Sequence, residues 1–202
     1  MSHPQTSEQA VLQLARKHPL LRARDLAREG LPTIALTRLV SAGKLERVGR
    51  GIYSLPNQAV SENRSLAEVA IRVPRGVICL VSALRVHDIG TQAPHEIWLA
   101  IPHRMLTPRL DKPALRVIRM SGPSLTEGID RLKVDGVEVL VFNAAKTIAD
   151  CFKFRNKIGL DVALEALKNA RAQRKASADD LWHFAKICRV ANVMRPYLEA
   201  IG

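Results

Sequence analysis

The sequence predicts an α+β protein in which a short N-terminal domain precedes a mixed α/β domain with a small sheet and a helical end. Three observations support this fold class. Residues 6–56 combine helical spacing of apolar residues with two short strand-like runs, residues 77–142 hold apolar strands separated by turns, and the residues after 142 return to a helical period. Strands followed by a run of helices are typical of α+β architecture.

The stretch 31–56 (LPTIALTRLVSAGKLERVGRGIYSLP) organises the N-terminal domain. Pro32 suits the first position of a helix, where its missing N–H costs nothing, and Gly43 suits the position just past a helix end. We therefore expect a helix over residues 32–42. Its outward side chains would be mainly short, hydroxylated or basic.

A basic hairpin should follow this helix directly. Residues 44–48 and 52–55 are typical of short strands, and the Gly-Arg-Gly run between them permits the positive φ angles of a tight turn. Arg50 is thereby held at the tip of the hairpin.

Two helical runs precede the stretch. Thr6 and Gln9 predict a capping box at the start of the first, and residues 21–29 predict a second helix that Gly30 ends. Helix, helix, glycine-containing turn, helix and basic hairpin is the order of a winged helix-turn-helix domain. We expect residues 1–56 to form this domain and to bind double-stranded DNA.

In such a domain the third helix enters the major groove and the hairpin touches the flanking backbone. Arg38 could reach a guanine edge, and Arg50 suits the backbone or the minor groove. The candidate DNA contacts are Thr33, Thr37, Arg38, Ser41, Lys44, Arg47 and Arg50. The alternative interpretation of each is an ordinary exposed side chain on a helix and hairpin that only pack into the fold.

The charge balance agrees with a polyanionic partner. The formal net charge is +12 and the isoelectric point is near 10.3, which favours nucleic acid without choosing between DNA and RNA. Three cysteines without metal-binding spacing predict reduced core thiols, and neither a signal peptide nor a long apolar run is visible. We expect a cytoplasmic protein that requires no membrane, metal or cofactor.

A polar linker over residues 57–64 should lead to a C-terminal domain over residues 65–202. The Asp135-Gly136 pair predicts a two-residue hairpin. Strands are expected over residues 77–81, 96–101, 115–120, 128–134 and 137–142, and helices over 65–73, 83–87, 144–154, 160–171, 178–190 and 195–200.

Residue types of a hydrolase triad occur in Ser82, His87 and Asp88, but no nucleophile elbow surrounds the serine. His95 and His103, with His87, likewise lack the spacing of a metal site. We therefore expect no enzyme activity.

A metal-dependent nuclease is the enzyme alternative that remains open. Asp135 and Glu138 are the carboxylates considered for it, and no lysine of the usual nuclease pattern follows them.

A basic zone marks the helical end of the chain. It comprises Lys153, Arg155, Lys157, Lys168 and Arg171, with Arg174 and Lys175 beyond them. Such a charge run is usually a solvated helix face, and the competing hypothesis is a functional positive surface, used against a partner of this domain or for nucleic acid.

Four runs of the sequence resemble the AbiEi family of antitoxins from type IV toxin–antitoxin systems. They are RVGRGIYSLP (47–56), PRGVICLVSALRVHDIG (74–90), PHEIWLAIP (94–102) and FNAAKTIADCFKFRNKIGLDVALEALK (142–168). The resemblance covers nearly the whole chain and implies a bacterial two-domain protein. Its winged helix would bind inverted repeats near its own operon and repress it, and its C-terminal domain would counteract a nucleotidyltransferase-like toxin.

The resemblance does not imply a tight complex with the toxin, so direct contact stays open. We expect a monomer that can bind inverted repeats in pairs. The alternative function is a standalone winged-helix transcription regulator whose C-terminal domain senses a ligand or partner.

Overall fold

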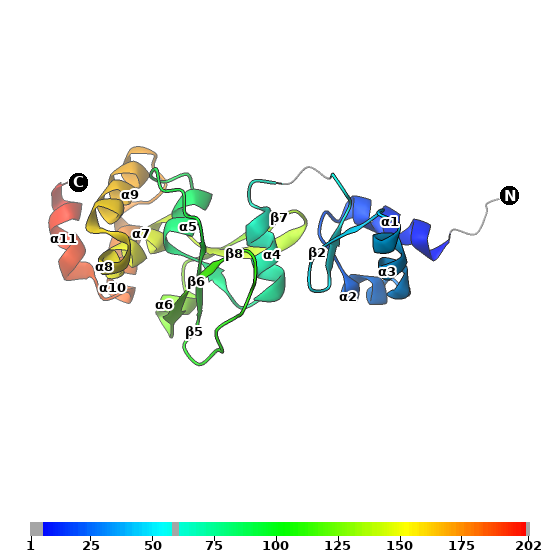
Figure 1. Ribbon diagram of the computed structural model, residues 1–202. Helices are drawn as coiled ribbons and strands as arrows, with labels where there is room; N and C mark the ends of the chain where they lie inside the picture. The colour runs from blue at the N-terminus through cyan, green and yellow to red at the C-terminus, as the bar shows by residue number, and fades with distance from the viewer. Residues whose placement is uncertain (1–5, 58–60, 201–202) are drawn as a thin grey trace. The chain divides into compact units, whose positions relative to one another are not determined.

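The computed structural model describes residues 6–57 and 61–200 (Figure 1). The chain divides into two compact units. The first consists of Met1–Ile71 and Lys133–Glu138, and the second of Arg72–Leu132 and Val139–Gly202. The domain limits expected from the sequence, with a linker over residues 57–64, stay a prediction.

The first unit begins with three helices and a three-stranded sheet. The elements are α1 (Ser7–Lys17), β1 (Leu21–Arg22), α2 (Ala23–Arg28), α3 (Ile34–Ser41), β2 (Glu46–Gly49) and β3 (Ile52–Ser54), and α4 (Arg64–Arg72) ends at the division between the units. The strand order is β1-β3-β2. The capping box predicted for α1 is confirmed, because the Gln9 N–H donates to Thr6 Oγ1 and the Thr6 N–H donates to the Gln9 side chain.

The helix predicted over residues 21–29 is partly wrong. Leu21 and Arg22 form strand β1, which pairs with Tyr53 and Ile52 of β3, and the helix begins only at Ala23. The reason is a long-range one: Leu21 is fully buried and gains both a core position and a strand partner. Gly30 has a φ angle of +66°, as expected of a glycine that ends a helix.

One hydrophobic cluster holds the three helices and the sheet together. Its buried members are Val11, Ala15, Leu21, Leu26, Ala35, Leu36, Leu39 and Leu45. They come from all three helices, from β1 and from the turn before β2. The cluster therefore fixes the orientation of α3 relative to the rest of this region.

The second unit contains a five-stranded sheet and a helical end. Its strands are β4 (Val77–Ile78), β5 (Ile97–Pro102), β6 (Leu115–Met120), β7 (Ile129–Val134) and β8 (Val137–Phe142), in the order β6-β5-β4-β8-β7. The tip of the β7–β8 hairpin, residues 133–138, is assigned to the first unit. Strands β4 and β5 are antiparallel, whereas β4 with β8 and β5 with β6 are parallel.

Seven helices accompany the described part of this sheet. They are α5 (Leu80–Val86), α6 (Pro123–Thr126), α7 (Ala144–Lys153), α8 (Arg155–Ile158), α9 (Leu160–Ala172), α10 (Ala178–Ile187) and α11 (Ala191–Ala200). The expected helix over residues 195–200 begins earlier, at Ala191, because Met194 is fully buried and anchors its first turn. Pro196 accordingly lies inside the helix and not at its start.

The strand predicted over residues 77–81 is also too long. It ends at Ile78, and α5 begins at Leu80 with Cys79 as its N-cap. Ser82, which directly precedes the helix predicted over residues 83–87, therefore lies inside α5. Its hydroxyl accepts the Trp98 N–H at 3.0 Å, which ties α5 to β5.

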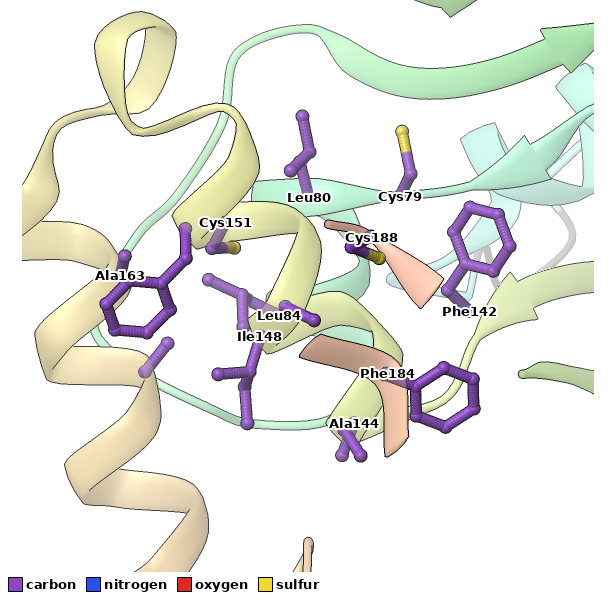
Figure 2. Close-up of a cluster of buried hydrophobic side chains, with 14 of the residues drawn as sticks. Cys79, Leu80, Leu84, Phe142, Ala144, Ile148, Cys151, Ala163, Phe184 and Cys188 are labelled. Atoms are coloured by element: carbon purple, nitrogen blue, oxygen red, sulfur yellow. The ribbon is translucent and has the colours of Figure 1, made fainter. Parts of the chain in front are cut away.

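Helix α7 is the centre of the second unit's core. Every residue from Ala144 to Phe152 is buried, so the helix has no solvent-facing side until its last turn. Figure 2 shows Ala144, Ile148 and Cys151 of α7 among Leu84 of α5, Ala163 of α9 and Phe184 of α10. This burial includes the polar residues Lys146, Thr147 and Asp150 as well as the apolar ones.

Candidate nucleic-acid interface

The outward face of α3 is one narrow stripe. Ile34, Thr37, Arg38 and Ser41 follow the spacing i, i+3, i+4, i+7 and are all exposed, whereas Ala35, Leu36 and Leu39 on the opposite side are buried. The helix is shorter than the predicted 32–42. Thr33 takes the N-cap position without a capping hydrogen bond from its side chain. The stripe combines two hydroxyl groups, a guanidinium group and one apolar side chain.

The hairpin after α3 presents Arg50 at its tip. Residues 50 and 51 form the turn between β2 and β3, and Gly51 has a φ angle of +69°, a conformation that L side chains adopt rarely. The strand pairing is irregular between Arg47 and Gly49. Arg47 donates from Nε to the Gly49 carbonyl at 3.4 Å. An irregularity of this kind changes the direction in which side chains point and bends the strand.

The cations of this region carry charge that is not neutralised. Arg38, Lys44, Arg47 and Arg50 are exposed, and among the described residues none of them forms an ion pair. The stretch from 32 to 56 contains one carboxylate, Glu46, against these four cations. By contrast, Arg22 is bound to Asp25 through two contacts of 2.7 Å. The Arg22 side chain also holds the pKa of Asp25 below its usual range, although burial of that carboxyl opposes the shift.

Ile34 is the residue of this face that the sequence-based candidate set omitted. Its side chain is 55% exposed, which makes it one of three large hydrophobic residues exposed in the described structure. It lies in the first turn of α3, on the same stripe as Thr37 and Arg38. The i+3 and i+4 spacing from Ile34 was the available signal, but an apolar residue is not usually sought on a polar face.

The basic residues of the helical end have different surroundings. Lys153 and Lys157 both lie near the Phe154 ring, with their Nζ atoms 5.9 and 5.8 Å from its centroid. Arg155 is half-buried and donates to the Phe152 carbonyl at 2.9 Å. Lys168 and Arg171 lie one turn apart on α9. Lys175 donates to the backbone carbonyls of His87 and Asp88, and Arg174 is exposed.

The residues considered for catalysis are held apart by separate partners. Ser82 is bound to the backbone of β5, and the His87 imidazole donates from Nε2 to the Phe142 carbonyl at 2.7 Å. Asp135 accepts a hydrogen bond from Ser61 at 2.9 Å. Within the described ranges, no three His, Cys, Asp or Glu side chains are placed to share a metal ion.

Residues 9–56 match a family model described as transcriptional regulator, AbiEi antitoxin. The resemblance to AbiEi antitoxins is thereby confirmed over these residues, which include α3 and the hairpin. No curated protein matches the chain.

One solved structure shares the fold over most of the chain. It is the crystal structure of the RV2827C protein from Mycobacterium tuberculosis, with a TM-score of 0.62 and 15% sequence identity. The similarity covers 92% of this chain and 73% of that chain. In the described residues no helix is both long and apolar enough to cross a membrane.

Proposed function

We propose that the part of the first unit from α1 to β3 is a winged helix-turn-helix that binds double-stranded operator DNA, and that the protein is a transcriptional regulator of the AbiEi antitoxin type. The observation that carries the proposal is the exposed stripe on α3, opposite the buried face that fixes this helix in its unit. The stripe and the hairpin lie within the residues that match the AbiEi family model. The proposal assigns no catalytic activity to the chain.

In this proposal α3 enters the major groove. Arg38 is long enough to donate to the O6 and N7 atoms of guanine, and Thr37 and Ser41 supply shorter hydrogen bonds to bases or phosphates. Thr33, Lys44 and Arg47 lie at or beyond the ends of α3 and are assigned to the phosphate backbone. Arg50 at the hairpin tip contacts the flanking backbone or the minor groove.

The regulatory target would be the protein's own operon. An autorepressor should bind DNA upstream of its gene more tightly than unrelated DNA of the same length. Fluorescence anisotropy with both duplexes in competition measures this difference directly. Equal affinities for the two duplexes would contradict the proposal. The same measurement on a duplex that carries two inverted half-sites would also show whether two copies of the protein bind together.

The second part of the proposal is that the protein counteracts a nucleotidyltransferase-like toxin of a type IV system. Its basic helical end is the proposed antitoxin surface, with Lys153, Arg155, Lys157, Lys168 and Arg171 as its members. Replacing Lys153, Arg155 and Lys157 together with glutamine should weaken rescue of cells that express the toxin, while operator binding stays intact. Full rescue by the triple variant would contradict this assignment.

A standalone regulator is the second candidate function. It would have no toxin partner and would instead respond to a ligand or protein bound by the second unit. This candidate would be favoured if the wild-type protein binds its operator specifically but does not rescue cells that express the toxin. A nuclease is tested separately by incubating the protein with plasmid and Mg²⁺ or Mn²⁺, because nicking that requires the metal would show the activity.

A further inference from the structure

The second unit contains a pocket of about 690 Å³ whose lining shares one residue, Lys153, with the proposed antitoxin surface. It lies where strand β6 ends and the chain turns into α6, and the ends of α7 and α10 complete its lining. All of its lining residues belong to the second unit. Pockets that hold small organic ligands usually measure about 300–1,000 Å³, so this one is large enough for a nucleotide-sized molecule.

Three cations line the pocket. Arg119, Lys153 and Arg189 come from β6, the end of α7 and the turn after α10, so the fold brings together residues far apart in sequence. Within the described residues none of the three forms an ion pair. The one carboxylate in the lining, Glu127, lies 3.5 Å from His183 Nε2. The pocket therefore carries an excess of positive charge.

Arg119 is held rigidly without being neutralised. Its Nη1 donates to the His103 and Met105 carbonyls at 2.7 and 2.6 Å, and its Nη2 donates to Thr107 Oγ1 at 2.9 Å. All three acceptors are uncharged. Because the guanidinium group is already fixed, an anion that approaches it loses little further side-chain entropy on binding.

An apolar wall forms another part of the lining. Met120, Phe154 and Ile187 line the pocket, and Phe154 is half-buried against the core of the second unit. Lys153 Nζ lies 5.9 Å from the centroid of the Phe154 ring. An aromatic ring beside cations suits a ligand that has a flat ring to stack and a phosphate group to bind. An inorganic anion alone would leave the apolar wall exposed.

We propose that this pocket is a binding site for a mononucleotide, with the phosphate group between Lys153, Arg189 and Arg119 and the base against Phe154 and Ile187. The site is separate from the α3 stripe and does not depend on whether that stripe binds DNA. Ser121 adds a hydroxyl group to the lining that can contact the phosphate or the sugar, whereas the Ser124 hydroxyl donates to the Ile187 carbonyl at 3.3 Å. Binding of a nucleic-acid strand by the same cations, without binding of any mononucleotide, would overturn the proposal.

The test is isothermal titration calorimetry on the full chain at low salt. The probes are AMP, GMP, CMP and UMP, with adenosine and inorganic phosphate as partial ligands. At least one mononucleotide should bind the wild type more tightly than either partial ligand does. The Lys153→Gln/Arg189→Gln variant should weaken that binding at least about tenfold, because each charge-assisted hydrogen bond is worth more than a factor of ten.

Two further variants sharpen the test. Glu127→Gln removes the carboxylate that competes with the ligand, so it should tighten binding about twofold to fivefold, the range of an exposed ion pair. Arg75→Gln/Arg195→Gln removes the same charge as the first variant from exposed positions outside the pocket and should leave the affinity unchanged. Thermal unfolding of each variant shows that the fold is retained.

Four results would overturn the proposal. The first is no binding of any mononucleotide at about 10 mM, a concentration that detects even weak ligands. The second is equal weakening by the two double variants, because this would show a general charge effect. The third is that inorganic phosphate binds as tightly as each of the mononucleotides. The fourth is a single-stranded oligonucleotide that loses affinity in the Lys153→Gln/Arg189→Gln variant while mononucleotides do not bind at all.

Discussion

Lys146 Nζ and Asp150 Oδ2 lie 2.5 Å apart, one turn from each other on α7, and both side chains are completely buried. Asp150 also accepts a hydrogen bond from Cys188 Sγ at 3.2 Å. The Lys146 ammonium group lies 3.9 Å from the centroid of the Phe142 ring. Each charge thus has its partners inside the core, and neither could be removed without leaving the other buried alone.

We expect Lys146→Met to lower the free energy of unfolding by about 3–5 kcal/mol, since it leaves an uncompensated buried carboxylate. Adding Asp150→Ala should recover part of this loss, because the second change removes that charge. Urea unfolding of both single variants and of the double variant forms the required cycle. A double variant that loses the sum of the two single losses would contradict the pairing.

The same pair predicts how stability depends on pH. Burial raises the pKa of Asp150 from its usual value near 3.8, and Lys146 opposes this shift. The folded state therefore holds this proton more tightly than the unfolded state does. The stability that Asp150 contributes is present below the unfolded pKa and is lost as pH rises through the folded pKa. In Lys146→Met this loss should extend to higher pH. The stability of Lys146→Met can be measured by urea unfolding as pH rises above the unfolded pKa of Asp150. A rise in this stability relative to that of the wild type would contradict the pairing of Lys146 with Asp150.

The three cysteines should be unreactive in the folded protein. Cys79, Cys151 and Cys188 are buried, and burial raises the pKa of Cys188 to about 12 and that of Cys79 and Cys151 well above the usual range. Since the thiolate is the reactive form, a disulfide reagent at pH 8 should modify none of them until the protein unfolds. The number of modified thiols is measured from the chromophore that the reagent releases, before and after guanidinium chloride is added. One rapidly modified thiol in the native protein would be inconsistent with the core described.

Local chemistry made several elements predictable from the sequence. Asp135 and Gly136 have φ angles of 49° and 80°, as the two-residue turn between β7 and β8 requires, and β6 has the predicted bounds. Ser177 caps α10 by accepting the Asp180 N–H at 3.1 Å. In each case the residues that determine the structure are neighbours in the sequence.

The remaining features depend on distant residues. The apolar run from Val77 to Val81 fits both a buried strand and a buried helix, so its division depends on tertiary contacts such as the hydrogen bond between Ser82 and Trp98. Lys146 and Asp150 have the spacing of a common exposed ion pair, so the sequence does not indicate their burial. The pocket could not be predicted, because its cations meet only through the tertiary fold.

The exposed side chain of Ile34 predicts contact with a thymine methyl group, if α3 binds in the major groove as proposed. Replacing the contacted thymine by uracil should weaken binding about fourfold, because burying one such carbon group is worth about 0.8 kcal/mol. The Ile34→Ala variant should not distinguish the two bases. Anisotropy titrations with each thymine of the operator replaced in turn would locate the contact. If every replacement affects wild type and variant alike, Ile34 makes no such contact.

Operator binding at several salt concentrations tests the central claim most directly. The wild type is compared with Arg38→Ala/Arg50→Ala and with Arg16→Ala/Arg28→Ala, which removes the same charge from exposed positions on α1 and α2. We expect the wild type to bind its upstream DNA specifically and with a steep salt dependence. The Arg38/Arg50 variant should lose about 1–3 kcal/mol for the base contact and about one unit of salt slope, and the control should keep its specificity. Equal, sequence-independent binding by all three proteins would contradict the assignment of α3 and its hairpin to DNA.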